Sequence, residues 1–367
     1  MHVSDMLEAE GVALVNHGLA LWRQGSREEA VTTMRQGIAV CRRLAVAEPA
    51  KINHLALALS NLGAMLDEWG RTAEAIPVLE HSIKIMRIYS DKSHEFTADL
   101  AGALKNLGSA LNQCGSQPEA ISTLTESVET YQSLVEQGRL QYELPLALAL
   151  NSLGNARGLV AAAMDDFDAG IALLRHQDFE DSVEAAMLLA STLASQCGVL
   201  MHLTAYERAL VNSEEAVAIF RRLGEANPAG VEPYLATALV TRAEALTAVD
   251  RLDEAHTAAT EAIGIVRRCS AAKPDGWRNR LIRALRLLVD LLPALNRHAE
   301  AAVAAKELAR LVEEDRHDVK ALHRPSPRSR RSPSSPASGA GVVRPPGRGG
   351  ECMSASRSPG PAGPGRT

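Results

Sequence analysis

The chain has 367 residues and a formal net charge of -5, and 46% of its residues are hydrophobic but only 3% are aromatic. It has no N-terminal apolar segment typical of a secretion signal, no run of eighteen apolar residues, and five widely spaced cysteines without a C-x-x-C pair. These features argue against a secreted, membrane-spanning or disulfide-stapled protein, and we expect a soluble cytoplasmic chain of closely packed Ala- and Leu-rich helices.

A unit of about 45 residues repeats from the N-terminus onward. A Leu-Gly phrase (Leu62-Gly63, then Leu107-Gly108) precedes an acid-Ala phrase whose alanine, Ala75 or Ala120, lies twelve residues after the glycine. Leucines at helical spacing around each glycine predict one helix, and a second glycine seven residues on ends it in the left-handed conformation. Each unit is thus predicted to hold two antiparallel helices of about 16–19 residues, A and B, with small residues at their contact.

The fourth unit departs from this pattern. Its Leu-Gly phrase is Leu153-Gly154, but Ala161 to Ala163 replace the second glycine, and the next acid-Ala phrase is Asp168-Ala169. The sequence therefore predicts an insertion before Asp168, with a register irregularity or hinge in this unit.

Three further units follow. Gly198 is the predicted small residue of the fifth helix A, Arg208-Ala209 is an acid-Ala phrase that has lost its acid, and Pro293 is expected to bend the last helix A. The seven alanines are then separated by 45, 45, 49, 40, 46 and 46 residues (Ala30, Ala75, Ala120, Ala169, Ala209, Ala255, Ala301). Seven units predict fourteen helices and an all-α solenoid over residues 1–316.

The last segment, residues 317–367, has a different composition. From residue 321 on, 47 residues hold nine Pro, nine Ser and eight Arg but one acid, Glu351, so this stretch carries +7 and the preceding 320 residues carry -5 - 7 = -12. We expect a disordered tail rich in Arg, Ser, Pro and Gly. An acidic array repels phosphate, so nucleic acid is not expected as a partner of anything but the basic tail.

These phrases resemble the tetratricopeptide repeat (TPR), in which a small residue in helix A precedes an alanine in helix B. The long unit, with Asn61 to Gly63 and Glu74 to Pro77, resembles the kinesin-light-chain subclass and the repeat arrays of bacterial signalling proteins. The resemblance covers residues 5–316. It implies a right-handed α-α superhelix that binds a protein or peptide on its concave face.

Catalytic and metal-binding patterns are missing from the sequence. Its eleven histidines form no H-x-x-x-H or H-E-x-x-H pair, and neither a G-x-x-x-x-G-K-[ST] loop nor a G-x-S-x-G elbow occurs. We therefore expect no enzyme activity, no cofactor and no metal site.

The candidate binding residues form an asparagine ladder on helix A. Asn16, Asn61 and Asn106 lie two residues before the helix A glycine, and Asn151 lies three before Gly154. By resemblance to the kinesin-light-chain subclass, such a ladder binds the main chain of an extended peptide, since a carboxamide both donates and accepts hydrogen bonds. The predicted groove, in the N-terminal half, adds neighbours on the same wall (Ser60, Glu68, Lys105, Ser109, Asn112, Asn155). The alternative is that each Asn only caps or cross-links adjacent helices.

Two functions remain open from the sequence. The first is a scaffold or adaptor that binds a protein or peptide partner. The second is the sensor or regulatory component of a bacterial signalling system whose effector domain lies on another chain. An enzyme is a distant third.

Overall fold

The computed structural model describes residues 3–89, 94–176, 182–272 and 277–322. Within these ranges the chain forms fourteen α-helices and no strand, which confirms the predicted all-α solenoid of seven two-helix units. The helices run from 14 to 25 residues, so several are longer than predicted. Their bounds are α1 (Val3–Arg23), α2 (Arg27–Ala47), α3 (Ile52–Glu68), α4 (Thr72–Tyr89), α5 (His94–Gln113), α6 (Gln117–Glu136), α7 (Glu143–Arg157), α8 (Ala162–His176), α9 (Val183–His202), α10 (Tyr206–Ala226), α11 (Pro228–Ala248), α12 (Leu252–Ala272), α13 (Arg278–Leu291) and α14 (His298–Leu322). Short 3-10 turns at Pro49–Lys51 and Leu140–Tyr142 lead into α3 and α7.

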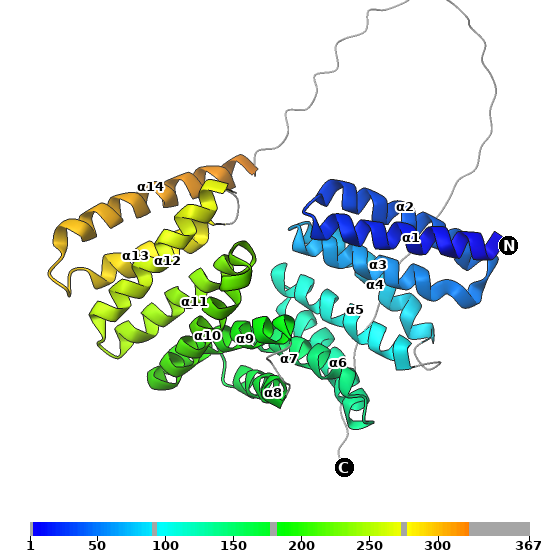
Figure 1. The fold of residues 1–367 in the computed structure, drawn as a ribbon, viewed down its shortest axis with the longest axis horizontal. Helices are drawn as coiled ribbons and strands as arrows, with labels where there is room; N and C mark the ends of the chain where they lie inside the picture. The colour runs from blue at the N-terminus through cyan, green and yellow to red at the C-terminus, as the bar shows by residue number, and fades with distance from the viewer. Residues whose placement is uncertain (1–2, 90–93, 177–181, 273–276, 323–367) are drawn as a thin grey trace, which may run out of the picture. The chain divides into compact units, whose positions relative to one another are not determined.

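Odd-numbered helices are the A helices and even-numbered helices the B helices. In units one to six each A helix packs on the B helix of its own unit, and each B helix packs on the next A helix (Figure 1). A helices of successive units also touch one another directly, from α1·α3 through to α11·α13. The core is accordingly a series of apolar clusters along the array, as expected when each unit buries its apolar face against its neighbours.

Small residues set the distance between helices A and B. A Cβ atom on Gly63 would lie 2.4 Å from Cγ of Leu79, and one on Gly108 would lie 2.4 Å from Cγ of Leu124. Further along α4, Ser82 is fully buried, and its hydroxyl donates to the carbonyl of Ala56 at 2.7 Å. The prediction that small residues allow close helix packing in these units is confirmed.

The turns between helices A and B follow the predicted capping rule with one extension. Gly25, Gly70 and Gly115 have φ angles of +85°, +83° and +81°, the left-handed conformation that ends helix A. In units five to seven the same position is held by non-glycine residues with φ angles of +56°, +61° and +58° (Thr204, Asp250, Asn296).

Unit four is shorter than predicted, not longer. Helix α7 ends at Arg157 and Gly158, with a φ of +75°, takes the left-handed position four residues after Gly154 instead of seven. Phe167 then packs on Gly154 as Leu79 packs on Gly63, with its ring 2.8 Å from where a Cβ would lie. The counterpart of Ala75 is therefore the fully buried Ala163, and the expected insertion before Asp168 was wrong. With this correction the seven alanines are separated by 45, 45, 43, 46, 46 and 46 residues.

Two expectations for the later units also need correction. The small residue of helix α9 is Cys197, which is fully buried and lies twelve residues before Ala209, whereas a Cβ on Gly198 would meet nothing closer than 3.7 Å. Pro293 lies beyond the end of α13 at Leu291 and so does not bend it. Gly198 was assigned from residue type without the fixed twelve-residue spacing, and Pro293 was misplaced because α13 ends earlier relative to its small-residue position, Val289, than α3 does relative to Gly63.

Arginine–glutamate pairs join successive B helices. In four interfaces an arginine of one B helix forms a salt bridge at 2.7 Å with a glutamate of the next B helix (Arg87–Glu126, Arg175–Glu215, Arg221–Glu261, Arg267–Glu307). Each arginine lies twelve residues after the repeat alanine of its own helix B, and each glutamate lies six residues after the repeat alanine of the next. Arg208 stands where other units have an acid before the repeat alanine, and it forms a salt bridge with Asp168 at 2.6 Å. The equivalent positions of units two and one hold Glu74 and Arg35, so the same pair occurs there with the two charges exchanged. Because these pairs are exposed, each contributes only about 0.2–1 kcal/mol.

Helix α9 is the one described helix that is long and apolar enough to cross a membrane, and it packs inside the array against α8, α10 and α11. At the other end of the array, α14 runs to Leu322, six residues past the predicted end of the repeats. The rest of the predicted disordered tail, residues 323–367, lies outside the described residues.

Candidate partner-binding groove

The A helices carry one stripe of side chains that packing does not bury. In α3 the residues with intermediate or full exposure recur as Leu57, Asn61, Ala64 and Glu68, while the leucines between them are buried. The same phase in α5 gives Gly102, Asn106, Ser109 and Gln113. We call this set of positions, counted from the small residue of each helix A, the A-helix stripe.

Three predicted asparagines lie on the A-helix stripe. Asn16 is exposed, and Asn61 and Asn106 are half-buried. The side chains of Asn61 and Asn106 form no hydrogen bond within the described part of the chain. Their amide groups are therefore available to an incoming donor or acceptor, whereas a cross-linking role between helices would need such a bond.

Other predicted residues differ in how open they are. Ser60 is only 8% exposed, so it lies beneath the stripe. Glu68 is exposed and accepts a hydrogen bond from Nε1 of Trp22 at 2.9 Å, which joins α1 to α3. Lys105 is half-buried, and burial lowers the pKa of its ammonium group, while the nearby Glu68 and Asp67 act in the opposite direction.

The remaining predicted residues extend the groove toward unit four. Ser109 and Asn112 of α5 are half-buried. Asn151 is half-buried and Asn155 is exposed, and the Asn155 amide donates to Oδ1 of Asn151 at 3.4 Å. Because Asn151 is three residues before Gly154, its phase is that of Ser60 and Lys105, and the true counterpart of Asn61 in α7 is Ser152.

Sequence reasoning missed the C-terminal half of this stripe. With Cys197 and Ala243 as the small residues, the position of Asn61 is held by the half-buried Ser195 in α9 and by Thr241 in α11. Thr241 is only 3% exposed and its hydroxyl donates to the Thr237 carbonyl at 3.2 Å, so the open part of the stripe continues through unit five. Ser195 and Thr241 line a cavity of about 410 Å³ together with residues of three successive A helices (Ser191, Tyr234, Thr237, Arg280, Arg283). The twelve-residue spacing from Ala209 and Ala255 was the signal that could have found them.

Two arginines of α13 form one side of that cavity. The Arg283 Nε donates to Glu244 at 2.8 Å, so its charge is paired. Arg280 donates to the hydroxyl of Thr237 at 3.2 Å, and its guanidinium lies 5.5 Å from the ring centroid of Trp277. The groove thus changes from amides in units one to three to hydroxyls and guanidinium groups in units five to seven.

The described residues include no group of three His, Cys, Asp or Glu side chains that could hold a metal ion. Burial raises the pKa of Asp99 on α5 and of Asp166 on α8 to about 6 each.

No family model and no curated protein matches this chain. Solved structures do. BtubC (BKLC) from P. vanneervenii is 18% identical, with 68% of this chain and 92% of that chain covered, at a TM-score of 0.52. The apo form of RapI is 10% identical over 83% and 77% of the two chains, with a TM-score of 0.54. A STAND protein with a tetratricopeptide repeat sensor from Pyrococcus horikoshii is 12% identical, with 84% of this chain and 45% of that one covered and a TM-score of 0.51.

The fold is of the tetratricopeptide-repeat type. The small-residue spacing, the left-handed turns and the two-helix units described above agree with this assignment. In this TPR array the A helices touch one another and carry the open stripe, while the B helices carry the ladder of ion pairs.

Proposed function

We propose that this TPR protein is a protein-interaction scaffold or adaptor that binds an extended segment of a partner along the A-helix stripe. The observation that carries the proposal is the recurrence of a small polar side chain that packing leaves open at one position of five successive A helices (Asn16, Asn61, Asn106, Ser152, Ser195). The sixth A helix has the buried Thr241 at this position. Extended main chain presents alternating donors and acceptors, which amides and hydroxyls can satisfy without reading a particular side-chain sequence. The proposed role is one of binding, in the cytoplasm, without catalysis.

A sensor or regulatory role for the same groove is the second candidate. It is supported by likeness of fold to a STAND protein whose repeats are called a sensor. In that role, partner binding on this chain would change the activity of an effector on another chain. The adaptor and the sensor therefore share a first step, which the following experiment tests.

The test compares peptide binding by matched variants. Peptides selected from a random library on the wild-type protein are titrated by fluorescence anisotropy against the double variant Asn61→Ala, Asn106→Ala. Two hydrogen bonds, each worth about 0.5–1.5 kcal/mol net, predict a loss of affinity of roughly 5- to 150-fold. The melting temperature should remain unchanged, because neither amide bonds another part of the described fold.

The matched control removes two exposed amides from B helices, Gln36→Ala and Gln132→Ala. This control should bind the peptide as the wild type does. A double variant on the stripe that binds normally but melts at a lower temperature would favour the alternative role for these asparagines, the cross-linking of helices.

A further inference from the structure

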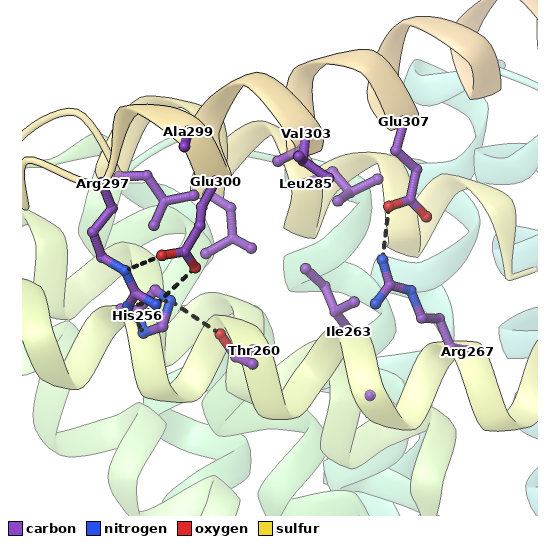
Figure 2. A pocket seen from close by; sticks show the side chains of 14 residues that line it. His256, Thr260, Ile263, Arg267, Leu285, Arg297, Ala299, Glu300, Val303 and Glu307 are labelled. Carbon is purple, nitrogen blue, oxygen red and sulfur yellow. Dashed lines mark hydrogen bonds and ion pairs between the residues drawn. The ribbon is translucent and has the colours of Figure 1, made fainter.

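A pocket of about 550 Å³ lies among the last three helices (Figure 2), and its α13 residues are not at positions of the A-helix stripe. Its walls are Ile263 of α12, Leu285, Leu288 and Leu292 on and just after α13, and Ala304 of α14. We call it the terminal pocket. Its volume falls within the range of about 300–1,000 Å³ that is typical of small-molecule sites.

The pocket lies at the interface of units six and seven, where the residues at two repeat positions differ from those at the interface of units five and six. Between α10 and α12 the corresponding space is occupied by Arg242 and Glu214, whose side chains pair at 3.7 Å. The equivalent residues around the terminal pocket are Leu288 and Thr260, which are apolar or small. An ion pair is thus replaced by empty space with an apolar wall.

Packing of the last unit also widens the space. Ala301 has intermediate exposure, although its six counterparts in the other B helices are fully buried. The small-residue position of helix α13 holds Val289, where the other A helices have Gly, Ala or Cys. In α14, Leu308 stands seven residues after Ala301, where the other B helices have Gly, Ala or Ser. Larger side chains at both contact points keep α14 from approaching α13 as closely as other helix pairs do.

A related groove between α4 and α6, of about 460 Å³, shows how the terminal pocket differs. Its floor is also apolar, with Ile83, Leu104 and Leu107, but Glu80 and Lys84 lie over it. The residues at those two repeat positions in the terminal pocket are Thr260 and Gly264. An apolar ligand between α4 and α6 would therefore contact charged side chains at two positions where the terminal pocket has uncharged ones, and desolvating those two charges costs free energy.

Paired charges flank the pocket at both ends. Arg267 bonds Glu307 at 2.7 Å at one end, and Arg297 bonds Glu300 at 2.7 Å at the other, so the four charges sum to zero. His256 lies beside Arg297, with Nε2 2.9 Å from Nη1, and burial, then the charge of Arg297, lowers its pKa. The His256 ring is therefore neutral at neutral pH. Its distance to Arg267 along α12 corresponds to about 16 Å, which limits the length of an occupant.

We propose that the terminal pocket binds a neutral, largely apolar small molecule that forms one hydrogen bond near His256 and Thr260. The neutral lining gives no net attraction to an ion, and the flanking ion pairs leave an apolar stretch only about 16 Å long between them. Oγ1 of Thr260 lies 3.5 Å from Nε2 of His256, which also faces Nη1 of Arg297, so the Thr260 hydroxyl is the group that can donate or accept a hydrogen bond with a ligand. This site is separate from the A-helix stripe and does not depend on the function proposed for it.

The test uses N-phenyl-1-naphthylamine, a neutral aromatic amine that fluoresces more strongly in apolar surroundings. We expect saturable binding with one site per chain. Gly264→Leu should weaken it at least tenfold, because the new side chain enters the pocket, and a Cβ there meets only Nη1 of Arg268 at 3.8 Å. The matched control, Lys84→Leu, places the same side chain at the same repeat position in the other groove and should leave the affinity of the terminal pocket for the probe as in the wild type.

A second variant guards against a folding defect. Val303 is 70% exposed at the rim, so Val303→Glu should keep the helical circular dichroism signal and still weaken binding of the probe. Absence of saturable binding, or equal loss in Lys84→Leu, would overturn the proposal. So would a wild-type dimer by light scattering that Gly264→Leu converts to a monomer, because a second copy would then be what covers the pocket.

Discussion

Alanine at Gly108 and at Gly198 should change stability in opposite directions, although both glycines lie within A helices. A Cβ at position 108 would lie 2.4 Å from Cγ of Leu124, a fully buried branch point that cannot move aside, whereas a Cβ at position 198 meets nothing within 3.7 Å. Gly→Ala inside a helix stabilises by about 1 kcal/mol, and overpacking costs about 1–3 kcal/mol. Gly198→Ala should therefore gain about 1 kcal/mol, and Gly108→Ala should lose up to about 2 kcal/mol.

The decisive measurement is the effect of Gly108→Ala in a background that removes the clash. Leu124→Ala alone should destabilise by about 2–5 kcal/mol, and adding Gly108→Ala to it should stabilise, because only helix propensity then remains. Urea unfolding followed by circular dichroism gives the free energies. Since a repeat array can unfold unit by unit, hydrogen exchange of α5 and α6 reports the local effect. If Gly108→Ala stabilises the wild-type protein as Gly198→Ala does, the packing argument is wrong.

Two further predictions concern buried titratable groups. The pKa of Asp99 is raised to about 6, chiefly by burial and then by Glu95, so the folded state binds its proton more tightly than the unfolded state does. The contribution of Asp99 to stability should thus become more favourable as pH falls from 7 through about 6 toward 4, and Asp99→Asn should raise the melting temperature at pH 8 more than at pH 5. An equal shift at both pH values would contradict this. Burial raises the pKa of the Cys197 thiol to about 12, so this thiol is protonated and unreactive at pH 8. An aromatic disulfide reagent should therefore label the exposed Cys114 but not Cys197 until urea is added. Peptide mass spectrometry identifies the labelled cysteines. Equal labelling rates in the native protein would mean that Cys197 is not held in the helix contact.

The first three units could be predicted from the sequence because their contacts demand glycine. Gly63 and Gly108 face Leu79 and Leu124 so closely that no other residue fits, and Gly70 and Gly115 adopt the left-handed conformation. Because these positions require glycine, glycine recurs in the sequence at the same spacing. The phase of Asn61 and Asn106 followed directly from it.

The later units were harder to interpret because their contacts accept more than one residue type. Cys197 fits the helix contact and its thiol donates to the Ala209 carbonyl, so a neighbouring glycine, Gly198, was taken for the small residue. Asp168-Ala169 matches the acid-Ala phrase in residue type, but both residues are exposed. The alanine that packs at the helix contact is Ala163, and no acid precedes it. A pattern of residue types failed at both positions. The twelve-residue spacing from Ala209 would have identified Cys197, but the shortened unit four breaks that spacing at Ala163.

The pockets could not be predicted from the repeat pattern, because they arise at positions that the helix contacts leave free. Helix packing within a unit fixes the small residue of helix A and the alanine of helix B, but the residue just before the small one can be Leu107, Arg242 or Leu288 without disturbing that contact. Arg242 reaches Glu214 and fills the space between two B helices, whereas Leu288 leaves it open. A single exchange at such a position therefore creates or removes a cavity while the backbone remains a TPR array. Leu288→Arg combined with Thr260→Glu should rebuild the ion pair in the last unit, abolish binding of the neutral probe, and leave peptide binding on the A-helix stripe unchanged.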